Sequence, residues 1–518
     1  MSGTEHRSEE FVPADEPPTE PRDPRVVPFA SFLLVAAFGI WGLVSPEAMT
    51  TASVGLVDFV LGNIGWLYLA LANGFLVLSL WLALGRHGRL RLGPDDARPE
   101  FSTASWLAML FAGGMGSGLV FWGVAEPITH FAHPPGLIAG ATPEAARRAM
   151  VLTNLHWGLH AWAIYGICAL VLAYFIFRRE LPGLISTPLR ATMSPSTSLT
   201  VAGWTSDVVA AFAVVFGLAG SLVMGVLQVR AGITEMLGFA PTLAMSVGIL
   251  LVLAIAFMIS ASTGLSKGIQ ILSNINMVLV LALLAIVFVL GPTPFIMSAF
   301  VNALGDYTSS LPAYALRVLS YEDQMDWTTA WTLTYLIWWV AWGPFVGIFI
   351  ARISRGRTIR EFCVGVILVP TLFSILWFAA LGGTGIWIEL NGVGLTGLVD
   401  EDISKALFAF LQFLPLTEML SAVSVFLIFV FLVTSADSGT FVISMMTSEG
   451  QLNPRTRLKL GWGVAITLLT LSILLSGSVE VAKAMAAFGA VPFTLILVLQ
   501  VVAFLRALKD EPVSEKSS

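Results

Sequence analysis

The chain has 518 residues, of which 56% are hydrophobic and only 12% are charged, and its mean hydropathy is +0.84. Because a soluble globular protein carries about 25% charged residues, this composition excludes a soluble protein and predicts one that crosses a membrane many times. The formal net charge of −6 decides little, since the distribution of charge in a membrane protein matters more than its sum.

The first residues differ from the rest of the chain. Residues 1–25 are rich in proline and charged side chains and poor in large apolar ones, so we expect a disordered cytoplasmic tail. No apolar core with a cleavage site precedes the first apolar segment, which predicts no secretory signal. Cys168 and Cys363 each lie in an apolar run and are expected to be packing residues, neither metal ligands nor a disulfide.

Apolar segments long enough to cross a bilayer recur along the chain, and they predict an all-α polytopic membrane protein with twelve transmembrane helices. The segments are residues 26–46, 61–85, 104–124, 148–177, 205–232, 240–261, 268–290, 327–350, 361–387, 416–446, 458–476 and 482–506. Basic residues gather in every second connection. By the positive-inside rule, both termini are therefore expected in the cytoplasm, with the protein in the cell membrane.

The order of these segments predicts internal symmetry. Two leading helices in 26–85 precede five helices in 104–290 and five more in 327–506. An odd number of helices inverts the second unit relative to the first, as in many secondary transporters. The transporter domain then covers 26–508, and 509–518 is a short cytoplasmic tail. Residues 292–326 are amphipathic and are expected along the outer surface, and a shorter amphipathic piece, 402–413, precedes the tenth segment.

The third segment is expected to be a broken helix. Four glycines fall within six residues: Gly113, Gly114, Gly116 and Gly118. Glycine weakens a helix, and backbone groups freed at membrane depth must line a cavity or be buried in protein. Transporters bind ions and substrates at such places; the alternative is a small-residue packing face. Pro127 is expected to end this segment, and Glu126 is either a buried acid or an anion at a helix end.

Aromatic rings gather in the middle of the fourth and eighth segments. At 100° per residue, Trp331, Tyr335, Trp338 and Trp342 form one stripe, and Trp339 lies beside it. Membrane tryptophans usually lie at the water interfaces, whereas indole faces at the midplane can hold an organic cation. A helix-packing seam is the alternative. Because the fourth segment carries a second set, Trp157, Trp162 and Tyr165, the two sets can form a cage.

Polar side chains occur within two apolar segments. In the tenth, Thr434 and Ser435 supply hydroxyl oxygens that suit a small cation such as sodium, or else they bond back to the preceding helical turn. Asp437 inside a span marks a functional site by default. In the fourth, His156 and His160 stand four residues apart, as proton carriers or as packing residues, and the sequence offers them no evident acidic partner.

Several stretches together resemble the betaine/carnitine/choline transporter family: residues 114–127, 156–165, 338–347 followed by 350–362, and 434–438. The resemblance runs from about residue 25 to 508. It implies the leucine-transporter fold with a 5+5 inverted repeat and two extra leading helices. It also implies a homotrimer in the lipid bilayer.

The resemblance also implies roles for particular residues. A trimethylammonium group would be held by Trp157, Trp162, Tyr165, Trp338, Trp339 and Trp342, while the backbone of Met115, Gly116 and Ser117 would face the substrate. One sodium site would comprise Ala112, Met115, Phe431, Thr434 and Ser435. Met277 matches the pattern of sodium-coupled members. Val214 and Leu218 replace the threonines of a second sodium site, and Gly118 stands where proton-coupled choline transporters carry aspartate.

These features together predict a secondary transporter, not an enzyme. We expect it to import a quaternary-ammonium compatible solute for osmoprotection, glycine betaine before other betaines, by sodium symport. Sodium is the coupling ion, no other cofactor is expected, and no nucleic acid is a partner. Proton-coupled choline uptake is the alternative. A polytopic membrane enzyme would need a catalytic cluster facing one membrane surface, and a purely structural subunit would not need the broken segment.

Overall fold

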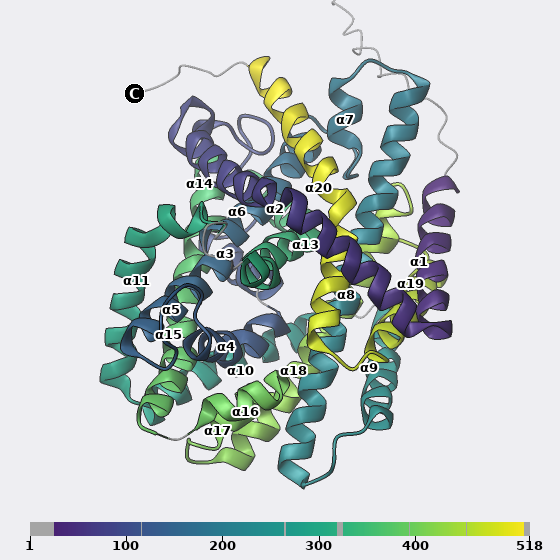
Figure 1. The fold of residues 1–518 in the computed structure, drawn as a ribbon. Coiled ribbons are helices and arrows are strands. Elements are labelled where there is room, and N and C mark those ends of the chain that lie inside the picture. Colours follow the sequence, from purple (N-terminus) through teal and green to yellow (C-terminus); the bar gives the residue numbers. More distant parts are fainter. Residues whose placement is uncertain are drawn as a thin grey trace, which may run out of the picture.

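The computed structural model describes residues 25–114, 116–263, 266–318, 325–392, 394–451 and 453–511. Over these ranges the chain is helical, and its only β-type pairing is an isolated bridge between Arg91 and Thr358. Figure 1 shows long helices wrapped around one another, with α20 passing through the middle of the view. The predicted all-helical membrane architecture is confirmed.

The first part of the chain forms the leading helices and the helices up to residue 290. They are α1 Val26–Val44, α2 Pro46–Leu84, η1 Arg86–Arg89, α3 Thr103–Gly114, α4 Ser117–Ala132, α5 Pro143–Trp157, α6 Leu159–Ala173, η2 Tyr174–Arg178, α7 Thr187–Thr192, α8 Thr197–Leu237, α9 Leu243–Thr263 and α10 Ser266–Leu290. The second segment was predicted to begin at residue 61, but the helix α2 already starts at Pro46. Proline is pre-organised for the first helical turn, and at Ile64 the helix is kinked but not interrupted.

The remaining helices follow in the second part. They are α11 Thr293–Ala315, α12 Met325–Thr328, η3 Thr329–Leu333, α13 Thr334–Ile353, α14 Ile359–Cys363, η4 Val364–Leu368, α15 Val369–Leu390, α16 Leu395–Glu401, η5 Ile403–Lys405, α17 Ala406–Leu411, α18 Thr417–Met446, α19 Thr456–Leu474 and α20 Val479–Lys509. Three short π-helical turns, η2, η3 and η4, interrupt otherwise regular helices.

Eleven helical segments in the described ranges are long and apolar enough to span a membrane. They correspond to all the predicted segments except the third, which is divided into α3 and α4. Gly116 between them has extended backbone angles (φ −86°, ψ −155°), so the helical hydrogen bonds stop there. The predicted break in the third segment is confirmed.

Pro127 does not end this segment, contrary to the prediction. It lies inside α4, which continues to Ala132. A membrane helix tolerates an internal proline when neighbouring helices satisfy or cover the freed backbone. Here α15 packs directly on the proline ring, because a Cβ at Gly382 would collide with Pro127. The Trp377 indole N–H of α15 also donates to the Leu119 carbonyl of α4 at 3.0 Å.

The fourth segment is broken as well, which the sequence analysis did not predict. Gly158 (φ −100°, ψ −132°) separates α5 from α6. A Cβ at this position would collide with the Asn154 carbonyl and lie 2.7 Å from the Tyr307 hydroxyl. His156 and His160 therefore belong to two different helices, and the expected i, i+4 relation on one helix is wrong.

The interior is built where long helices cross. The helix α8 packs against α18 and α20, α13 packs against α6 and α20, and α1 lies along α19. The predicted amphipathic stretch 292–326 begins as α11, which packs against α5 and α15, and its residues 319–324 lie outside the described ranges. The shorter piece, 402–413, forms η5 and α17. The division into two inverted five-helix units stays a prediction.

Candidate functional site

The break between α3 and α4 meets the polar stretch of α18. A Cβ built on Gly116 would lie 3.8 Å from the Ser435 hydroxyl oxygen, so the two segments are in van der Waals range. Ser117 is the first residue of α4 and is buried. The first amides of a helix have no partner within it and favour negative charge. One side of the break can therefore accept an anionic group while Ser435 offers an oxygen to a cation.

The predicted sodium ligands are visible only in part. Phe431 and Thr434 lie on α18 with Ser435, as predicted. The Thr434 hydroxyl donates to the carbonyls of Val430 and Phe431, each at 3.0 Å, which is the back-bonding alternative. Met115 lies outside the described residues, and of Ala112 only its place in α3 is described.

The aromatic sets of the fourth and eighth segments meet around Trp339. The Trp339 ring packs edge-on against Trp157, with centroids 4.9 Å apart, and against Tyr165 at 5.7 Å. Trp162 packs edge-on against Tyr165 at 5.8 Å. Rings of the fourth segment, from α5 and α6, form one wall of a cluster, and rings of α13 form the other. We call this cluster the cage: Trp157, Trp162, Tyr165, Trp338 and Trp339.

The break at Gly158 helps to hold the cage together. It ends α5 at Trp157 and leaves carbonyls of the last turn without the helical partners that a continuous helix would provide. One of these, the His156 carbonyl, accepts a 2.8 Å hydrogen bond from the Trp339 indole N–H. A backbone interruption in one wall therefore anchors the central ring of the other.

Trp338 lies flat on Trp339, with centroids 6.0 Å apart and 5° between the planes. It is buried, and its indole N–H has no hydrogen-bond partner among the residues that the structure describes. A buried donor without a partner is costly. This N–H is thus available to an acceptor that enters the cage, such as a carboxylate.

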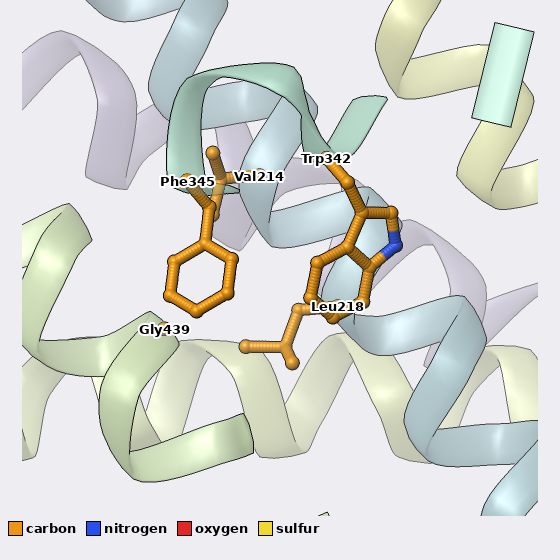
Figure 2. A pocket seen from close by; sticks show the side chains of 5 residues that line it. All are labelled: Val214, Leu218, Trp342, Phe345 and Gly439. Atoms are coloured by element: carbon orange, nitrogen blue, oxygen red, sulfur yellow. The ribbon is translucent and has the colours of Figure 1, made fainter. Parts of the chain in front are cut away.

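Trp342 lies apart from the other five predicted rings. It packs edge-on against Phe345, at 5.5 Å, and no ring contact between described residues joins it to the cage. Figure 2 shows its indole beside a small apolar pocket that is also lined by Val214, Leu218, Phe345 and Gly439. Val214 and Leu218 are the residues that replace threonines in the predicted departure from a second sodium site, and they supply only carbon to this pocket.

A buried acid lies at the centre of the cluster, which is the first of the two alternatives that the sequence left open for Glu126. Glu126 is fully buried, and its Oε1 lies 2.6 Å from Nδ1 of His156. Its Oε2 accepts from the Trp157 indole at 2.7 Å and from the Tyr335 hydroxyl at 2.6 Å. The expectation that the histidines have no acidic partner is wrong for His156. The only available signal was an acid within an apolar segment.

Asp437, which the sequence marked as functional, faces another way. The Ser260 hydroxyl of α9 donates to its Oδ2 at 2.7 Å. His160, the other predicted histidine, lies 3.2 Å from the Asn73 side-chain oxygen of α2. Both polar side chains therefore join neighbouring helices.

An interrupted helix at a buried site within the membrane is typical of many-pass solute transporters. A sequence model of the BCCT, or betaine/carnitine/choline family transporter, group matches residues 26–513. The chain belongs to this family.

Characterised and named relatives cover nearly the whole chain. A glycine betaine transporter of Bacillus subtilis is 39% identical over 92% of this chain and 93% of its own length. An ectoine/hydroxyectoine transporter of Virgibacillus pantothenticus is 41% identical over 94% of this chain and 96% of its own. A glycine betaine transporter of Acinetobacter baylyi is 36% identical over 93% of this chain and 72% of its own. The protein is thus a betaine/choline-type membrane transporter and not an enzyme.

Proposed function

We propose that this protein imports glycine betaine together with sodium by alternating access. The single observation that carries the choice of solute is the convergence of Trp157 and Trp339, from two helices, next to the interrupted third segment. Cation–π contact contributes about 1–2 kcal/mol for each well-placed ring once water is excluded. Several rings therefore offset much of the cost of removing a trimethylammonium group from water. Cytoplasmic termini and assembly as a homotrimer belong to the same proposal.

The polar groups beside the cage favour betaine over choline. Betaine carries a carboxylate and choline does not. The unpartnered indole N–H of Trp338 and the first amides of α4 are donors suited to a carboxylate. The names of two relatives, from Bacillus subtilis and Acinetobacter baylyi, agree with betaine.

Ectoine is the second candidate solute, because a relative that is 41% identical is named for it. Its positive charge is shared by the two nitrogens of an amidinium group within its ring, so it would use the same indole faces, and it also carries a carboxylate. Competition separates the two. Labelled betaine uptake into proteoliposomes is measured with a hundredfold excess of unlabelled betaine, ectoine, choline or carnitine. We expect the strongest inhibition by betaine; stronger inhibition by ectoine would make ectoine the substrate.

Sodium coupling rests on Ser435 beside Gly116. An inward sodium gradient should drive betaine accumulation, and a proton gradient alone should not. Ser435→Ala removes a hard oxygen ligand, so we expect the sodium concentration for half-maximal uptake to rise about tenfold, the size of one lost hydrogen-bond-like contact. Ser424→Ala, on the same helix, is the control because its buried hydroxyl has no partner in the described part of the chain. Uptake driven by protons without sodium would contradict the proposal.

A further inference from the structure

A carboxylate and an ammonium group are buried beside the cage, and the proposed transport cycle uses neither. Glu126 of α4 is fully buried, and Lys483 of α20 is 7% exposed. Buried charges within membrane segments are costly and persist where they serve a task. The contacts of the two residues indicate what this task is.

Glu126 connects both walls of the cage through one oxygen atom. Its Oε2 accepts from the Trp157 indole of α5 and from the Tyr335 hydroxyl of α13. The Trp157 ring packs on Trp339, and the Tyr335 ring stacks within 5.8 Å of Trp338. Hydrogen bonds to an ionised acceptor are shorter and about twice as strong as neutral ones. The carboxylate thus fixes Trp157 in one wall and, through Tyr335, the ring that stacks on Trp338 in the other.

Lys483 lies on the other side of the same tyrosine. Its ammonium nitrogen is 4.2 Å from the Trp331 ring centroid, 5.2 Å from that of Trp122 and 5.6 Å from that of Tyr335. It also donates to the Ala330 carbonyl at 3.2 Å, within the π-helical turn η3 at the start of the eighth segment. Tyr335 therefore meets the anion with its hydroxyl and the cation with its ring face.

We propose that Glu126 and Lys483 are positioning residues for the cage. The carboxylate orients Trp157 and Tyr335, and the ammonium balances its charge and holds Trp331 and the η3 turn against α20. Neither side chain touches the solute. This inference rests on the proposed function in one respect, namely that the cage is where the solute binds.

A metal site is the alternative role for Glu126 and the two histidines beside it. Ligand atoms of Glu126, His130 and His156 lie within 4.8 Å of one another. However, both His156 nitrogens have partners, since Nε2 lies 3.0 Å from the Thr332 hydroxyl, and both Glu126 oxygens are engaged. The hydrogen bonds that position the rings would have to break before a metal could bind.

A double-mutant cycle tests the pair. Glu126→Gln keeps an oxygen that accepts from Trp157 and Tyr335, but it removes the charge and replaces the oxygen that faces His156 with an amide N–H. Glu126→Leu removes all of these polar contacts. Lys483→Met removes the cation from the ring face of Tyr335 and leaves, among the described basic side chains, only His156 and His130 beside the carboxylate. We expect the KM for betaine to rise about tenfold or more in Glu126→Leu and in Lys483→Met, with the sodium dependence unchanged. The variant with both Glu126→Gln and Lys483→Met should return to within about threefold of Glu126→Gln alone, because coupled charges are not additive.

Multiplicative effects of the two substitutions, or a fall in maximal rate with KM unchanged, would overturn the proposal. A ligand-free measurement separates this outcome from failure of the proposed function. Near-ultraviolet circular dichroism of the purified protein reports the packing of its rings, and it should change in Lys483→Met and recover in the double variant even if wild-type protein takes up no betaine. Lys405→Met, a partly exposed lysine of η5, is the control, and no change of either signal is expected there.

Discussion

The role of Trp339 is the clearest consequence of the geometry at the scale of a single residue. Its ring contacts both Trp157 and Tyr165, and its N–H binds the His156 carbonyl. Trp339→Phe keeps a ring but loses the hydrogen bond, so we expect the KM for betaine to rise about tenfold. Trp339→Leu also loses the π face, and we expect a rise of about a hundredfold. Initial rates of labelled betaine uptake measure both.

The control for this prediction is Trp66→Leu, because Trp66 lies on α2 and is 59% exposed. It should leave uptake unchanged. If Trp339→Leu transports normally, the cage is not the solute site. Trp342→Leu is a further comparison: since Trp342 contacts Phe345 outside the cage, its effect on KM should be smaller than that of Trp339→Leu.

Sequence analysis predicted the rings better than the groups that hold them. The aromatic stripe of the eighth segment is visible from helical spacing, and the second aromatic set in the fourth segment predicted a cage. The Glu126 to Trp157 hydrogen bond joins residues 31 apart, and the Tyr335 to Glu126 bond joins residues 209 apart. Such partners depend on how the helices cross, which periodicity does not specify. Trp342 shared the stripe, yet it faces a different pocket.

At the scale of the element, the break at Gly158 determines how the fourth segment presents its rings. In Gly158→Ala the new methyl group would collide with the Asn154 carbonyl and approach the Tyr307 hydroxyl to 2.7 Å. We expect a loss of about 1–3 kcal/mol of stability, as for other overpacked sites, and a weaker affinity for betaine because α5 and α6 must shift. Thermal unfolding in detergent and substrate binding measure the two effects.

Gly62→Ala is the matched control. Gly62 lies within α2, and a Cβ there meets nothing within 4 Å. Alanine is the better helix former by about 1 kcal/mol, so unfolding should occur at the same or a slightly higher temperature. Equal behaviour of the two variants would show that the fourth segment tolerates a continuous helix.

The two helix breaks also differ in how well sequence predicts them. Four glycines within six residues are a strong signal, and the third segment is indeed divided. A single glycine is a weak one, because an isolated glycine inside a helix is tolerated. At Gly158 the helix is interrupted where Tyr307 of α11 comes close. The Tyr307 hydroxyl accepts a hydrogen bond from the Leu159 amide. That contact comes from tertiary packing.

At the scale of the whole molecule, Arg178 ties distant parts of the chain together near the end of the fourth segment. It donates to Glu511 at 2.6 Å and to the Gly93 carbonyl at 3.1 Å, and it also pairs with Asp95. Arg178→Gln leaves Glu511, which lies just beyond α20, without its charged partner. We expect a loss of about 2 kcal/mol of stability, measured as a lower unfolding temperature.

The control for the Arg178 interactions is Arg355→Gln. Arg355 is exposed and lies only loosely over the Phe177 ring, at 5.9 Å, so its loss should change stability by less than about 0.5 kcal/mol. High salt should reduce the difference between the Arg178 variant and wild type, since Asp95 is exposed and ions screen exposed pairs. A stability of Arg178→Gln equal to that of wild type would contradict the tie.

The hydrogen bond between the Trp339 indole and the His156 carbonyl has a consequence for solute selectivity in the two directions of transport. At 2.8 Å it fastens α13 to the end of α5, so these two helices would travel as one body while others slide past them. The cage would then keep the same arrangement of rings whichever side of the bilayer it opens to. A solute that binds weakly from outside would then also bind weakly from inside. Solutes ranked by their rate of efflux from loaded vesicles should therefore follow the same order as solutes ranked by uptake.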